Sequence, residues 1–152
     1  MRTVLILLLA ALPLIGCGQK SLFPIEPVEG TVTLDGVPLE GATVNFTPAN
    51  EGDGMSAVGL TNAQGLYKLT AFSGGLPEKG TMVGNYTVTI VLDRRARETT
   101  PEDDRILEQG GSIYIPIVHV VPRRYNRLET SGLTAEVVKG KNVFDFDLRS
   151  EN

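Results

Sequence analysis

Hydrophobic and polar residues alternate along most of the chain after residue 27. In residues 28–35, Val28, Gly30, Val32 and Leu34 share one side of the alternation and polar residues the other. A period of two predicts a β-strand with one buried face. The same pattern predicts seven further strands, at residues 42–47, 55–61, 66–71, 84–93, 112–121, 133–138 and 142–149. About seven or eight short strands with a single helix predict an all-β sandwich.

Turn residues separate these predicted strands. The pair Asp35-Gly36 and the run Asn62-Ala63-Gln64-Gly65 both predict tight turns. Glycine tolerates the positive φ that such turns require, and Asn can accept a hydrogen bond from the nearby backbone. The second turn predicts a hairpin between residues 55–61 and 66–71. Pro116 predicts that residues 112–121 form an edge strand or two broken pieces, because proline donates no ladder hydrogen bond.

One short helix is predicted from residue 101 to Gln109. Thr100 is suited to be its N-cap and Pro101 to occupy its first position. The acidic residues Glu102-Asp103-Asp104 come next, where the positive end of the helix dipole favours them. Gly110-Gly111 would end the helix.

The first 17 residues have a different pattern. Arg2 is followed by an almost entirely apolar run at residues 4–12 and by Pro13. This layout is typical of a secretory signal peptide, and the run is well short of the ~20 residues that a transmembrane helix needs. We therefore expect residues 1–16 to be a signal peptide, residues 17–27 a tether without periodicity, and residues 28–149 one domain. A transmembrane helix and an ordinary signal peptide remain the alternatives.

The end of this segment, Leu14-Ile15-Gly16-Cys17, resembles the lipobox of bacterial lipoproteins. The resemblance implies that Cys17 is lipidated and becomes the new N-terminus. Two or more acyl chains would hold the protein on a membrane essentially permanently. Gly18 after the cysteine implies, by the sorting rule of such lipoproteins, the outer membrane of the cell envelope, facing the periplasm or the exterior.

Composition narrows the possible partners. The chain has 14 basic and 18 acidic side chains, and removal of Arg2 with the signal peptide leaves 13 basic ones, a net charge of about −5. Nucleic acid is therefore not an expected partner, since phosphate binding requires a clustered positive face. Cys17 is the only cysteine. Its lipidation would leave no thiol for disulfides, metal or redox chemistry, and no cofactor is expected.

Two parts of the chain resemble known families. The sequences VEGTV (28–32), DGVPLEGATV (35–44) and TNAQGLY (61–67) resemble the carboxypeptidase regulatory-like domain, which implies a transthyretin-like β-sandwich and says little about activity. Three later segments are similar to the C-terminal half of small, planctomycete-type bacterial lipoproteins: residues 122–126, 130–135 and 142–148.

Catalytic motifs are weak, and we expect a non-enzymatic protein. His119 is the single histidine and lies in the alternation of residues 113–121, so we interpret it as a strand residue. Some transthyretin-like proteins hydrolyse 5-hydroxyisourate, but they use more than one histidine and end in Tyr-Arg-Gly-Ser. This chain ends Leu-Arg-Ser-Glu-Asn at residues 148–152, so that match fails.

Acidic residues form three candidate constellations. Glu51 with Asp53, and the run Glu102-Asp103-Asp104, could offer oxygens to calcium but lack the spacing of a calcium loop. We interpret the first as a solvated loop and the second as a helix start. Asp145 and Asp147 share one face of a predicted strand and Phe144 and Phe146 the other, so we interpret the aspartates as its polar face.

Two functions remain open. The first is a membrane-tethered structural or interaction module, and the alternative is a carbohydrate-binding module of the envelope. The alternative depends on tyrosines that could stack on sugar rings, namely Tyr67, Tyr86, Tyr114 and Tyr125. The candidate binding segment for an envelope protein or glycan contains Arg123, Arg124, Tyr125 and Arg127, with the tyrosine as anchor and the arginines as donors. The competing interpretation is a solvated loop whose tyrosine packs on the sandwich.

Overall fold

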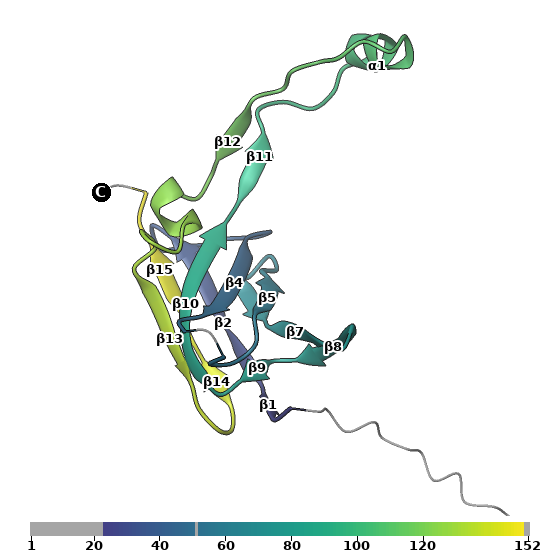
Figure 1. Cartoon of the computed structure of the whole chain (residues 1–152). Helices are drawn as coiled ribbons and strands as arrows, with labels where there is room; N and C mark the ends of the chain where they lie inside the picture. Colours follow the sequence, from purple (N-terminus) through teal and green to yellow (C-terminus); the bar gives the residue numbers. More distant parts are fainter. Residues whose placement is uncertain (1–22, 51, 151–152) are drawn as a thin grey trace, which may run out of the picture.

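The computed structural model describes residues 23–50 and 52–150. They consist mostly of β-strands in several sheets, with one short α-helix, α1 (Pro101–Glu108), and one 3-10 turn, η1 (Arg123–Asn126). This agrees with the predicted all-β sandwich (Figure 1). The predicted signal peptide, Cys17 and Glu51 lie outside the described residues.

The larger sheet has six strands in the order β13-β10-β4-β5-β7-β8. All its pairings are antiparallel, and its longest strand is β10 (Gly84–Val91). The other members are β4 (Thr43–Pro48), β5 (Ala57–Leu60), β7 (Thr70–Ser73), β8 (Leu76–Lys79) and β13 (Leu133–Val137). The predicted strands at 42–47, 55–61, 84–93 and 133–138 are all present.

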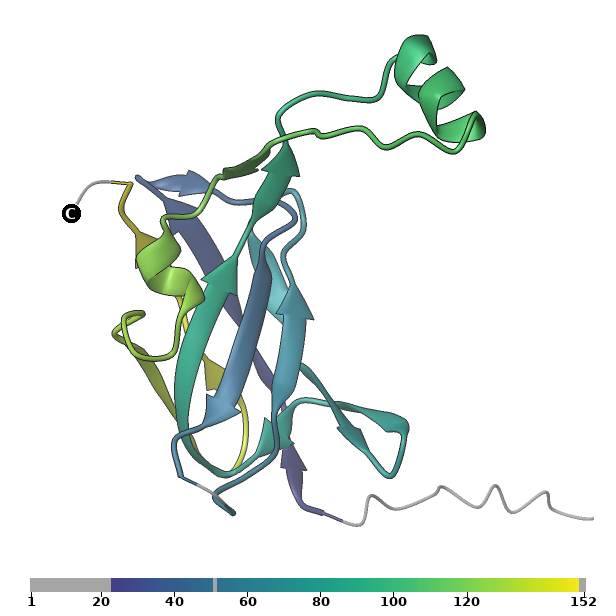
Figure 2. The same ribbon diagram turned by 45° about the horizontal axis from the view of Figure 1, so that its top comes forward.

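The second sheet is built around β2 (Val28–Leu34). On one side β2 pairs antiparallel with two short strands, β3 (Val37–Pro38) and β6 (Leu66–Lys68). On the other side it pairs parallel with the end of the chain, β14 (Asn142–Val143) and β15 (Phe146–Leu148). The first long strand and the last strands are therefore neighbours (Figure 2).

Both predicted turns are confirmed. Asp35 and Gly36 have φ values of 52° and 81° and join β2 directly to β3, as a two-residue hairpin turn requires. Gly65 has a φ of 72°. The Asn62 side chain accepts hydrogen bonds from the backbone of Gln64 and Leu66, both at 3.0 Å.

The predicted hairpin between residues 55–61 and 66–71 is confirmed only in part, because Thr70 and Ala71 pair antiparallel with Val58 and Ala57 whereas residues 66–68 do not pair with β5. The chain changes sheets at Leu69, so that β6 pairs with β2 whereas β7 pairs with β5. The Leu69 N–H donates to Val28 O at 2.9 Å and its carbonyl accepts from the Gly80 N–H at 2.8 Å, which ties the crossing point to both neighbours. Tyr67, Leu69 and Ala71 are all buried, so the alternation continues through the crossing.

The core lies between the two sheets and contains an aromatic cluster. The Phe46 ring lies 5.7 to 6.5 Å, between centroids, from four other rings, those of Tyr67, Tyr86, Phe144 and Phe146. Aromatic rings at such distances stabilise a core beyond their buried area. Phe144 and Phe146 thus face inward as the alternation predicted, whereas Asp145 and Asp147 are exposed.

Two small ribbons extend the sandwich. β1 (Ile25–Glu26) pairs with β9 (Thr81–Met82), so strand structure begins inside the segment predicted to be a tether. β11 (Asp93–Arg95) pairs with β12 (Ile117–His119) and continues directly beyond β10. The two ribbons lie at opposite ends of the molecule (Figure 1).

Candidate functional site

Residues 93–119 form a long projection, called the arm below. The β11–β12 ribbon is its base, and α1 is its tip, far from both sheets (Figures 1 and 2). Among the described residues, no arm residue belongs to the hydrophobic core; Leu92 and Val121, on either side of the arm, are its nearest members along the chain. A segment held by so few buried contacts is a poor contributor to sandwich stability, so its sequence is available for binding.

The tip helix forms as the sequence predicted. Thr100 is the N-cap, Pro101 is the first helical residue, and Gly110 follows with a φ of 78°. Thr100 and Asp103 form a capping box, and the Arg97 guanidinium binds the same Asp103 carboxylate. Asp103 is consequently a structural residue of the tip.

Apolar side chains of the arm are exposed to solvent. Tyr114 is 83% exposed, and Ile117 and Val118 are 60% and 50% exposed. A groove of about 460 Å³ runs along the same region, lined by Arg95, Thr99, Leu107, Ile113, Tyr114, Ile115 and Ile117. A large exposed apolar surface is typical of a binding site.

The charges of the arm are separated along its length. Arg94 and Arg95 lie at the base, and both are exposed. Glu98, Asp104 and Glu108 lie at the tip, and all three are exposed. None of these five forms an ion pair within the described residues, whereas Arg105 pairs with Glu102 at 2.9 Å. The arm is therefore positively charged at its base and negatively charged at its tip.

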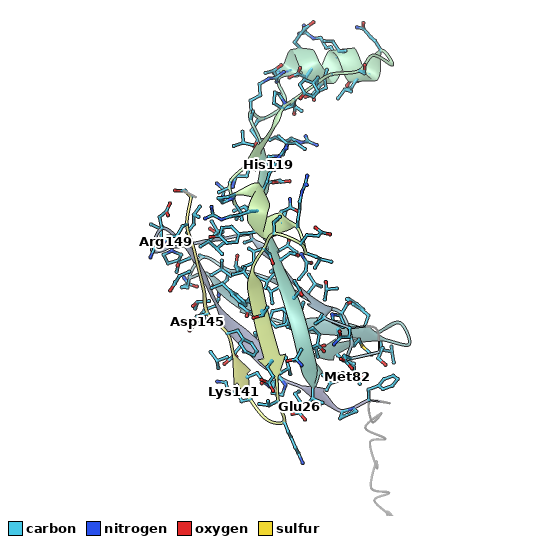
Figure 3. All side chains as sticks on the ribbon, turned by 60° about the vertical axis from the view of Figure 1, so that its left-hand side comes forward. Glu26, Met82, His119, Lys141, Asp145 and Arg149 are labelled. Atoms are coloured by element: carbon cyan, nitrogen blue, oxygen red, sulfur yellow. The ribbon has the colours of Figure 1, made fainter. Side chains whose placement is uncertain are left out.

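His119 fastens the base of the arm to the sandwich (Figure 3). Its Nδ1 lies 2.7 Å from Asp93 Oδ1, and its Nε2 lies 2.8 Å from an Arg123 guanidinium nitrogen. A guanidinium only donates, so Nε2 is the acceptor and the ring proton on Nδ1 is donated to Asp93. The nitrogen that a general base would use is thus occupied by Arg123. The contact connects β11, β12 and η1.

The segment predicted to bind a partner forms η1 and the residue after it, beside the base of the arm. Arg123, Arg124 and Arg127 line one shallow hollow of about 220 Å³ with Thr130. Tyr125 is 8% exposed and belongs to the core. The structure therefore brings the three arginines together on the surface, but it does not present Tyr125 as an exposed anchor.

The Tyr125 hydroxyl closes a network with the end of the chain. It accepts hydrogen bonds from the Arg124 guanidinium at 2.9 Å and from the Arg149 backbone N–H at 3.1 Å. Arg124 also donates to the Arg149 carbonyl oxygen at 2.8 Å, and its guanidinium carbon lies 4.6 Å from the centre of the Tyr125 ring. Arg124 and Tyr125 therefore attach η1 to Arg149, the residue that follows β15 (Figure 3).

The tyrosines do not form a shared platform for sugar rings. Tyr67 and Tyr86 are each 1% exposed, and their hydroxyls donate to the carbonyl oxygens of Phe144 and Met82. With Tyr125 also buried, Tyr114 on the arm is the one tyrosine ring that faces solvent within the described residues. The support that four tyrosines gave to a carbohydrate-binding module is therefore lost.

The acidic constellations have structural partners. Asp145 accepts from the Thr31 backbone N–H and hydroxyl at 2.7 and 2.6 Å, and Asp147 accepts from the Thr33 hydroxyl at 2.6 Å. Asp53 accepts from the Asn50 side-chain amide at 2.8 Å. No group of three or more His, Cys, Asp and Glu side chains that could hold a metal ion occurs in residues 23–50 and 52–150.

A second groove, of about 720 Å³, lies over the outer face of the β2 sheet. Its charged groups pair with one another or with neighbours. Glu29 binds Lys141 at 2.6 Å and Lys68 at 3.5 Å, and Asp145 binds Thr31. The Lys141 ammonium, followed by Lys68, holds the pKa of Glu29 below its usual value. With its charges already satisfied, this groove is a weaker candidate than the arm.

Sequence reasoning predicted an edge strand or two broken pieces at residues 112–121, and it missed the arm because it counted these residues among the strands of the sandwich. Only Ile117–His119 is a strand there, and Pro116 ends the pairing with β11. A signal was present, since Ile113, Tyr114, Ile115 and Val118 are apolar at both odd and even positions. A two-sided apolar strand needs cover on both faces, and a projecting ribbon has none.

Comparison of the chain with protein-family models, with curated proteins and with solved structures found no match. In the part of the chain that the structure describes, no helix is long and apolar enough to cross a bilayer.

Proposed function

We propose that this protein is a non-enzymatic, lipid-anchored protein of the bacterial cell envelope that acts as an interaction module. The β-sandwich is its scaffold and the arm is its binding surface. One observation carries the proposal: the arm exposes a run of apolar side chains, with Tyr114 83% exposed, on a segment that has no core of its own. Binding to another molecule would remove this surface from water.

The anchor at Cys17 is supported by the segment Leu14-Ile15-Gly16-Cys17 and the apolar run before it. The position of β1 fits such an anchor. It lies at the end of the sandwich opposite to the arm, with Glu26 and Met82 close together at that end (Figure 3). A protein held on a membrane through the segment before β1 would present its arm away from the lipid surface.

The proposal includes the transthyretin-like type of the sandwich. Its support is the Asp35-Gly36 turn, in which both residues have positive φ, together with the Asn62 turn that ends at Gly65. Both turns belong to the residues that resemble the carboxypeptidase regulatory-like domain. Strand-by-strand superposition of this chain on a structure of that domain would test the type, and a different connection of β2, β4, β5 and β10 would contradict it.

The anchor is tested by mass spectrometry of the protein extracted from membranes. We expect a mature N-terminus at Cys17 carrying a diacylglyceryl group and an N-acyl chain. In the Cys17→Ala variant, the unprocessed precursor should accumulate because the lipidated thiol is absent. A mature N-terminus elsewhere, or an unmodified Cys17, would contradict the anchor.

The binding surface is tested in living cells with a photo-crosslinking amino acid at position 114. Exposure to light should give covalent adducts, whose second component is identified by mass. The matched control carries the same amino acid at Val143, which is 55% exposed but lies on β14, away from the arm. Equal adduct patterns at both positions, or no adduct at position 114, would remove the arm as the binding surface.

A further inference from the structure

We propose that the arm binds the arm of a second copy of this chain, with the two arms antiparallel across a two-fold axis. The base of each arm then lies beside the tip of the other, and the apolar middle segments pack together. This inference rests on the proposed function, because it names the partner of the same binding surface.

The middle of the arm provides both apolar area and unused backbone. Tyr114, Ile117 and Val118 are each at least half exposed. Within the described residues, the backbone of residues 112–115 forms no hydrogen bond with another backbone group. An extended segment with exposed apolar side chains and open N–H and C=O groups is a template for strand pairing with another chain.

The charge distribution selects a second copy as the occupant. Arg94 and Arg95 make the base positive, whereas Asp104 and Glu108 make the tip negative. Two such arms in parallel would oppose like charges at both ends, but in antiparallel orientation each base meets a tip of opposite charge. A two-fold axis creates this arrangement, because each surface contacts the same surface of its partner in reverse.

The same distribution opposes a lipid surface as the occupant. Anionic membranes attract segments that are basic along their length and apolar on one face. The arm tip instead presents Glu98, Asp104 and Glu108 without ion-pair partners in the described chain. An acidic tip would be repelled by such a membrane.

The test measures the oligomeric state of the full lipidated chain, purified in detergent and followed by sedimentation over a concentration series. The wild-type chain should dimerise. One variant reverses the charge of the base (Arg94→Glu with Arg95→Glu), and another reverses the charge of the tip (Asp104→Lys with Glu108→Lys). Each should associate with itself about tenfold or more weakly, because each now opposes like charges at both ends of the interface.

Mixing the two reversed variants is the decisive measurement. In the mixed pair both contacts are attractive again, since the reversed base meets the reversed tip and the two unchanged ends also meet. The mixture should therefore dimerise although neither variant does so alone. This result would also show that both variants are folded. The antiparallel orientation is tested by the self-association of each variant, because parallel arms would oppose like charges at both ends in the wild type as well and would lose nothing on reversal.

The matched control reverses two exposed lysines away from the arm, Lys79→Glu with Lys139→Glu, and should dimerise like the wild type. The inference is overturned if the wild type stays monomeric, if the reversed variants dimerise unchanged, or if their mixture stays monomeric. If the chain is monomeric and position 114 forms adducts with other molecules, the partner is not a second copy of this chain, and the proposed function still stands. The absence of any adduct would instead overturn the proposed function.

Discussion

At the scale of single residues, substitutions of Tyr125 test whether η1 stabilises the fold or serves as a binding segment. Burial alone would raise the pKa of Tyr125, but hydrogen bonds from the Arg124 guanidinium and the Arg149 N–H outweigh it and lower that pKa. Tyr125→Phe, which loses only these bonds, should reduce the free energy of unfolding by about 1 kcal/mol. Tyr125→Ala should reduce it by roughly 3 to 5 kcal/mol, because it empties a core position.

Chemical denaturation measures both losses. Arg127→Ser is the matched control, since Arg127 lies two residues after Tyr125 but is exposed, in the shallow hollow that it lines with Arg123 and Arg124. It should leave the unfolding midpoint nearly unchanged. A Tyr125→Ala protein as stable as the wild type would contradict the core position of the tyrosine.

Gly30 should tolerate no side chain. A Cβ atom there would lie 1.8 Å from the Phe144 carbonyl oxygen, which is backbone and cannot move aside freely. Gly36 has open space around it but a φ of 81°. Gly36→Ala should therefore cost about 1 kcal/mol from conformation alone, and Gly30→Ala should cost clearly more. Equal unfolding midpoints for the two variants would show that β2 and residue 144 are not in close contact.

The alternation of hydrophobic and polar residues predicted which side chains are buried. It did not predict the hydrogen-bond partners of polar side chains. Val32, Val44, Phe46 and Val88 are core residues as their strands predicted. The same pattern could not show that the Tyr125 hydroxyl binds Arg149, or that Asp93 and Arg123 bind His119. These contacts join residues separated in sequence, and a local period carries no information on them.

At the scale of elements, α1 should lose stability in acid. The Arg97 guanidinium and the hydrogen bonds from Thr100 hold the pKa of Asp103 well below its usual range. A carboxylate with a lowered pKa stabilises the folded tip above its ordinary pKa of about 4 and loses this effect as the pH falls further. Chemical shifts of residues 101–108 should therefore move toward unfolded values in acid, ahead of those of β10.

Two variants isolate the cause of this response. Asp103→Asn should remove the pH dependence and loosen the tip at neutral pH, because an amide forms neither the ion pair nor the same capping box. Thr100→Ala should destabilise α1 by about 1 kcal/mol through loss of the N-cap. If acid unfolds β10 and α1 together, the tip is not an independent element.

Local signals located the elements, whereas sheet membership needed tertiary information. Thr100, Pro101 and Gly110 predicted the bounds of α1 because capping depends on adjacent residues. Residues 66–71 looked like one strand because Tyr67, Leu69 and Ala71 face the core on both sides of the crossing. The change of sheet depends on Val28 and Gly80, which are distant in sequence.

At the scale of the whole molecule, the sandwich and the arm should be separable. Replacement of residues 97–115 by Asn-Gly would join Ala96 to Pro116 by a two-residue turn and keep the β11–β12 ribbon. No core residue is removed, so the melting temperature should stay close to that of the wild type. Self-association should be lost. A chain that no longer folds after this change would show that the arm belongs to the sandwich.

The parallel pairing of β2 with β14 and β15 determines when this protein can fold. The Asp145 carboxylate bonds to Thr31 across 114 positions, so one flank of the central strand stays empty until residues 142–148 have been made. Contacts so distant in sequence slow folding, and synthesis delivers the N-terminal strand first. If the chain is exported through its proposed signal peptide while it is still being made, the second sheet is completed only on the far side of the membrane.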